Sequence, residues 1–152
     1  MRGNFAPSAS WLLTLTVSVA VALLPHAALA QQKLGASAGK SIFIKYCVTC
    51  HGVDGKGNGP DAHLLSKKPA DLTQIAKKNH GTFPSQRVAR VIDGRKGYID
   101  VAGNIQPAAH GPREMPIWGV RFAESENKGG GQAAARERVD QLVQYLKTIQ
   151  EK

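Results

Sequence analysis

Five consecutive residues, Cys47-Val48-Thr49-Cys50-His51, constrain this chain more than any other stretch. They contain both cysteines of the sequence, so no disulfide can form elsewhere. A Cys-x-x-Cys pair alone fits a redox disulfide, half of a zinc site or a covalent haem attachment. A redox disulfide of the thioredoxin type lies in a βαβ unit, which this sequence lacks. A zinc site needs a second Cys pair or a spaced His pair, which is also missing.

The histidine directly after the second cysteine favours haem. Each thiolate adds to one vinyl group on the same edge of the porphyrin, so a single helical turn has to present both sulfur atoms. The next side chain then reaches the iron as the proximal axial ligand. The motif therefore predicts one covalently bound haem c, attached through Cys47 and Cys50, with His51 on the iron.

Residues 1–30 are predicted to be a cleaved secretory signal peptide. Arg2 precedes an apolar run over residues 11–24, and Ala28 and Ala30 supply the small side chains that signal peptidase needs. The run is shorter than the ~20 residues that cross a bilayer as a helix. We therefore expect a single domain over residues 31–152 with no transmembrane segment after cleavage. Haem attachment and cysteine usage both suit the periplasm.

The apolar pattern of the remaining chain predicts an all-α domain with three main helices and one or two short ones. The main helices are expected over residues 38–50, 84–94 and 132–150, and a short helix is expected to begin at Asp71. Residues 95–113 show no sustained periodicity and are rich in Gly, Pro and Asn, so they are predicted to form a long ordered loop.

Two stretches resemble the class I c-type cytochromes. Gly39, Phe43 and Cys47 reproduce the spacing of the first helix of that family, in which a small glycine lets the last helix cross closely. Met115-Pro116, followed by an aromatic residue and glycine, is similar to the loop that brings the distal methionine. The resemblance covers most of residues 38–149 and implies the cytochrome c fold around one haem.

The resemblance also implies a haem pocket. After the motif, the glycine-rich loop over residues 52–60 would wrap the proximal haem edge, and the Pro60 carbonyl would accept a hydrogen bond from His51 Nδ1–H. Leu64 and Leu65 follow, and one or both are expected to pack on the macrocycle. Trp118 is expected close by, with its indole N–H directed to a partner such as a haem propionate.

Met115 is the sixth iron ligand that the resemblance implies, and it is the only methionine left after signal removal. Pro116 favours an extended conformation at Met115 and stops a helix from forming there. His110 is the best alternative ligand, since it lies five residues upstream in the same loop. The other histidines considered as rivals are His63 and His80.

These features predict a periplasmic one-electron carrier, not an enzyme, in which iron cycles between Fe(II) and Fe(III) while both axial ligands stay bound. No catalytic residue is expected. Two alternatives remain open at this point. One is a dedicated cytochrome subunit of a dehydrogenase or oxidase complex, and the other is a haem enzyme or sensor with a labile sixth ligand.

The net charge of the chain indicates what kind of partner it could bind. Without the signal peptide the chain has 19 Lys+Arg against 11 Asp+Glu, a formal net charge of +8. Such a surplus suits docking on an acidic redox protein, whereas export argues against nucleic acid. A solvated basic surface without a dedicated partner is the alternative, and a monomer is expected. The cations that could surround the haem edge are Lys45, Lys56, Lys67, Lys68, Lys77, Lys78, Arg113 and Arg121.

Overall fold

The computed structural model describes residues 30–96, 98–99, 105–106, 115–124 and 131–151. The predicted signal peptide, up to residue 29, and His110 lie outside these ranges. The chain divides into two compact units, residues 1–33 and 34–152. The description below concerns the second unit.

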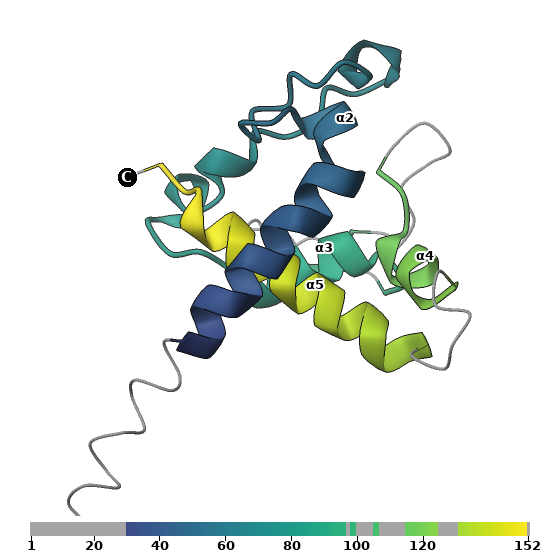
Figure 1. The fold of residues 1–152 in the computed structure, drawn as a ribbon. Helices are drawn as coiled ribbons and strands as arrows, with labels where there is room; N and C mark the ends of the chain where they lie inside the picture. Colours follow the sequence, from purple (N-terminus) through teal and green to yellow (C-terminus); the bar gives the residue numbers. More distant parts are fainter. Residues whose placement is uncertain (1–29, 97, 100–104, 107–114, 125–130, 152) are drawn as a thin grey trace, which may run out of the picture. The chain divides into compact units, whose positions relative to one another are not determined.

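The first helix begins earlier than the predicted residue 38, because within this unit it covers residues 34–46. It ends at Cys47, and the short helix α2 (Val48–His51) carries the rest of the motif. The close crossing expected at Gly39 is confirmed. A Cβ atom at Gly39 would collide with the backbone carbonyl of Gln141 in helix α5 (Gly131–Thr148). Figure 1 shows these two helices crossing.

Three single-turn 3₁₀ helices connect α2 to the next α-helix: η1 (Ala62–Leu64), η2 (Leu72–Gln74) and η3 (Lys77–Asn79). The short helix predicted at Asp71 is present as η2. The Asp71 carboxylate accepts the Thr73 backbone N–H at 2.9 Å and so caps its first turn.

Helix α3 (Ser85–Asp93) begins after Pro84 and ends at Gly94, as the sequence predicted. Gly94 has φ +68°, the left-handed conformation that glycine adopts most readily, and its N–H bonds the Arg90 carbonyl at 2.9 Å.

A strand pair and a short helix were not predicted. Within the expected 95–113 loop, strand β1 (Tyr98–Ile99) pairs antiparallel with strand β2 (Ile105–Gln106). Helix α4 (Trp118–Glu124) forms directly after the Met-Pro stretch. Trp118 and Phe122 lie one turn apart on α4 and their ring centroids are 5.2 Å apart, so aromatic packing stabilises this short helix.

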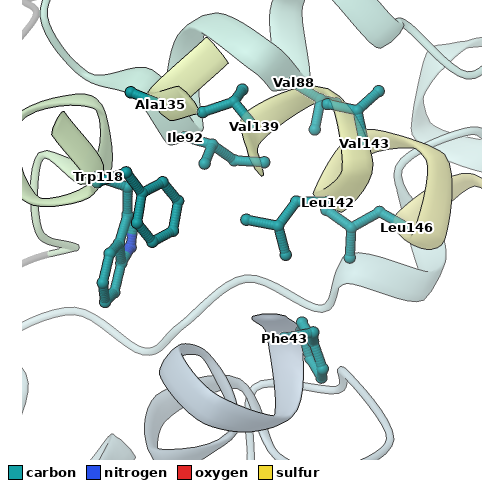
Figure 2. Packing of buried hydrophobic residues seen from close by; sticks show 10 residues of the cluster. Phe43, Val88, Ile92, Trp118, Ala135, Val139, Leu142, Val143 and Leu146 are labelled. Atoms are coloured by element: carbon teal, nitrogen blue, oxygen red, sulfur yellow. The ribbon is translucent and has the colours of Figure 1, made fainter. Parts of the chain in front are cut away.

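The core lies where the first helix, α3, α4 and α5 meet. Phe43, Phe122 and Leu142 are its largest fully buried side chains. Figure 2 shows Val88 and Ile92 of α3 beside the apolar face of α5, with Phe43 facing Leu142 and Leu146. The predicted all-α class is therefore confirmed, with one minimal strand pair added. Among the described residues, no helix is both long enough and apolar enough to cross a membrane.

Candidate functional site

A cavity of about 410 Å³ brings together three of the residues predicted to hold the haem: Cys47, His51 and Met115. They come from the end of the first helix, from α2 and from the segment before α4. Most of the remaining lining is apolar, and it is supplied by the first helix, the η2 region, α3 and α5. The other lining residues are Phe43, Ala70, Leu72, Ile75, Lys78, Arg87, Val88, Val91, Ile92, Leu142 and Leu146.

The Cys-x-x-Cys-His motif forms one helical turn. The His51 N–H bonds the Cys47 carbonyl at 2.9 Å, and the Cys50 N–H bonds the same oxygen at 3.3 Å. No disulfide joins the two cysteines, and both are half-buried. Burial, assisted by the neighbouring Cys50, raises the pKa of the Cys47 thiol to about 12. The turn therefore places the sulfur of Cys47 and the imidazole of His51 at the cavity, with the Cys50 thiol in the same turn but outside the lining.

His51 is held by one backbone acceptor. Its Nδ1–H donates a hydrogen bond to the Ala70 carbonyl at 3.1 Å, since a carbonyl oxygen can only accept. Burial lowers the pKa of His51, and the bond to Ala70 opposes this only in part. The ring is thus favoured as neutral imidazole, with Nε2 left as the atom that can bind a metal.

This bond corrects the expectation that Pro60 is the acceptor. The Pro60 carbonyl accepts a bond from His63 Nδ1 at 2.7 Å instead. The glycine-rich loop turns back on the motif, where the Asp61 N–H bonds the Thr49 carbonyl at 2.7 Å, and this keeps Pro60 exposed. Ala70 reaches His51 because the loop pairs with the segment that follows Pro69.

Met115 is half-buried at the cavity wall and packs against the core. Pro116 separates it from α4, which begins at Trp118, so Met115 remains outside the helix as predicted. His63 and His80 are exposed and do not line the cavity. The role of Met115 as the sixth iron ligand stays a prediction, and His110 stays the alternative candidate.

The other predicted pocket residues do not line this cavity. Leu64 is 64 % exposed, and Leu65 and Cys50 are half-buried outside the lining set. Trp118 is buried in the core, where its ring centroid lies 5.4 Å from that of Tyr46. Contact of Pro60, Leu64, Leu65 or Trp118 with a haem stays a prediction.

Sequence reasoning missed Arg87, one of two cations in an otherwise apolar lining. Arg87 Nη2 donates to Asn79 Oδ1 at 2.7 Å, which fixes the guanidinium. Lys78, the other cation, is one of the residues that the sequence analysis named as able to surround the haem edge. Among the described residues, neither belongs to an ion pair. The available signal was the position of Arg87 next to Val88 and one turn before Val91, on the apolar side of α3.

Residues 35–95 match the family model described as "Cytochrome C oxidase, cbb3-type, subunit III". The match supports a class I c-type cytochrome domain. The domain implies covalently bound haem c, and Cys47 and Cys50 have the spacing of its attachment site. The match ends before Met115, so it does not reach the predicted distal ligand. Searches of the curated proteins and of the solved structures return no significant match.

The cavity of this cytochrome is lined by groups that suit a haem chemically. Its volume of about 410 Å³ lies within the range of small-molecule and cofactor sites, ~300–1,000 Å³. Apolar side chains from α3 and α5 suit the faces of a macrocycle, and the two cations suit its carboxylates. Haem-based electron transfer is therefore the activity that the domain supports.

Proposed function

We propose that this cytochrome is a one-electron carrier whose haem iron is held by His51 and Met115. The observation that carries the proposal is the single cavity that Cys47, His51 and Met115 share with a set of apolar side chains. Covalent attachment at Cys47 and Cys50 would place the macrocycle against His51. Met115 would then approach from the segment before α4.

The chain's own residues account for the properties of a carrier. Bound haem supplies the Fe(II)/Fe(III) couple. The Ala70 carbonyl fixes the His51 ring, so Nε2 keeps one orientation. A thioether ligand prefers Fe(II), and an apolar lining disfavours the additional charge of Fe(III), so both raise the reduction potential. Lys78 and Arg87 are suited to hold the two propionates.

The test is an absorption spectrum of the purified protein in both oxidation states, combined with its mass. The expected product carries one haem on two thioether bonds. A weak far-red band is expected in the oxidised protein and should be absent from Met115→Ala. His110→Ala is the matched control and should keep the band. Loss of the band only in His110→Ala would instead make His110 the ligand, and rapid carbon monoxide binding by the wild type would indicate a labile sixth position.

We further propose that the carrier is exported to the periplasm and docks on acidic partners. The signal-peptide pattern and the formal +8 charge of residues 31–152 support this. N-terminal sequencing of the periplasmic fraction should begin at Gln31. The rate of electron transfer to an acidic redox partner should fall steeply with salt. A salt-independent rate would contradict docking through charge.

A second candidate, a cytochrome subunit of an oxidase complex, is favoured by one observation. The matching family model is named for a subunit of a cbb3-type oxidase. Affinity purification of the tagged protein from solubilised membranes distinguishes the two. Fixed stoichiometry with other subunits would indicate a complex subunit, whereas recovery in the free form would indicate a shuttle.

A further inference from the structure

We propose that Gln150 and Glu151, in the segment after α5, are positioning residues for the proximal histidine. They do not line the cavity. Their hydrogen bonds to the backbone of residues 72–76 hold the segment whose Ala70 carbonyl accepts the His51 Nδ1–H. They thereby set how strongly His51 donates electrons to iron. The inference rests on the proposed function, because it treats His51 as an iron ligand.

Gln150 holds both sides of η2. Its Oε1 accepts the Ala76 backbone N–H at 2.8 Å, and its Nε2 donates to the Leu72 carbonyl at 2.8 Å. Nε2 also donates to the Leu146 carbonyl at 2.7 Å, which ties the side chain to the last turn of α5. One half-buried amide group therefore joins α5 to the start and to the far end of the 72–76 segment.

Glu151 adds a second set of bonds to the same segment. Its backbone N–H donates to the Thr73 carbonyl at 2.9 Å, and its carboxylate accepts a bond from Gln74 Nε2 at 2.5 Å. An ion pair of 3.2 Å links it to Lys56 in the glycine-rich loop. Both side chains of that pair are about half exposed, so solvent weakens it. The backbone bond to Thr73 and the amide bonds of Gln150 therefore hold the segment more firmly than this ion pair does.

The held segment leads directly to His51. The Leu72 N–H donates to the Gly55 carbonyl at 2.8 Å, and Ala70 lies two residues before Leu72. Gly57 in the same loop donates its N–H to the His51 carbonyl at 2.8 Å. Ala70 is thus supported from η2 on one side and from the loop on the other. Loosening η2 would move the acceptor away from the ring.

The chemical effect has a definite sign. A hydrogen bond from the non-ligating ring nitrogen increases the basicity of a metal-bound imidazole. A more basic ligand stabilises Fe(III) and lowers the reduction potential. Loss of the Gln150 bonds should weaken the Ala70 contact, reduce the basicity of His51 and raise the potential.

The test compares three variants of the haem-loaded protein. Gln150→Met keeps the length and packing of the side chain without its hydrogen bonds, and Gln150→Ala removes both. Gln141→Ala is the matched control, because Gln141 lies in α5, the helix that precedes Gln150, and its side chain bonds Glu137 within that helix. The measurements are the reduction potential and, in the Fe(II) state, hydrogen exchange of His51 Nδ1–H by NMR.

Both Gln150 variants should raise the potential and accelerate exchange of the ring N–H by about fivefold to tenfold, the size expected for one net hydrogen bond. Gln141→Ala should change neither. Unchanged potential and exchange in a haem-loaded Gln150→Met protein would overturn this inference alone. Bare thiols in the wild-type protein would overturn the proposed function as well.

A measurement on the wild-type protein needs no variant. If Gln150 and Glu151 support the acceptor of His51, then Ala76 N–H, Glu151 N–H and His51 Nδ1–H should exchange through one common opening. Similar protection of the three protons under denaturant would support the proposal. A ring proton whose protection does not follow the two backbone protons would refute it.

Discussion

Gly39 shows how much a single residue determines in this fold. A Cβ there would collide with the Gln141 carbonyl, and a backbone atom cannot move aside as a side chain can. At Gly35, one turn earlier, a Cβ would meet only the amide of Gln144, the far end of a flexible side chain. The two glycines lie on the same helix, but a side chain at residue 39 would meet backbone whereas one at residue 35 would meet a flexible side chain.

We predict that Gly39→Ala destabilises the protein by about 1–3 kcal/mol, the usual cost of overpacking, even though alanine favours a helix by ~1 kcal/mol over glycine. Gly35→Ala should be neutral or stabilising. Thermal unfolding of the two haem-loaded variants checks this. Equal melting temperatures would show that α5 can move away from residue 39.

Single residues also show what sequence reasoning could reach at the site. Cys47 and His51 were predicted from the motif and Met115 from the resemblance of its loop, and the structure places all three at one cavity. The acceptor of His51 was predicted wrongly as Pro60, because any residue supplies a backbone carbonyl and the sequence does not show that Ala70 supplies this one. Arg87 lies on the apolar side of α3, but the sequence does not show that this side faces a cavity.

At the scale of elements, the sequence predicted helix boundaries from their capping residues. It did not predict how the helices pack. Pro84 and Gly94 delimit α3 as predicted. Helix α4 escaped prediction because it has only two turns and depends on ring contacts with Tyr46 of the first helix, far away in sequence. A short helix made by tertiary contact leaves little periodic signal.

The end of α3 supports α4 through a charged pair. Asp93 and Arg95 form an ion pair of 2.5 Å, and a Cβ at Gly119 of α4 would touch both side chains. The bond from Arg95 holds the pKa of the Asp93 carboxyl below its usual value. A lowered carboxyl pKa contributes stability above the ordinary value of about 3.9, and this contribution is lost as pH falls through the folded-state pKa.

We therefore predict that Asp93→Asn lowers the free energy of unfolding at pH 7 and that the difference from wild type shrinks below pH 4. Urea unfolding at the two pH values measures it. Asp140→Asn is a suitable control, since Asp140 is exposed on α5. A difference that stays constant down to pH 2 would show that the pair contributes packing and not charge.

At the scale of the whole molecule, the cavity occupies the position of a core. The first helix, η2, α3 and α5 all supply apolar side chains to it. The cavity is open to solvent, so without the macrocycle these apolar side chains would face water. Burial of apolar surface contributes about 25 cal/mol per Å², and the total stability of a typical domain is only ~5–15 kcal/mol.

We predict that the double variant Cys47→Ala/Cys50→Ala, which cannot attach haem, loses cooperative unfolding and most of its helical signal. Circular dichroism during thermal and urea unfolding measures both. Wild type treated identically is the control. A helical variant with a sharp transition would show that the polypeptide packs without the macrocycle.

The contacts of Gln150 also have a consequence for the order of assembly. On the proposed export route, a chain that emerges from its N-terminus presents both thiols at least 100 residues before Gln150 arrives. Thioether formation can therefore begin on a nascent chain, while the geometry around His51 is completed only when the turn after α5 has docked. Attachment and ligand tuning become successive stages of maturation.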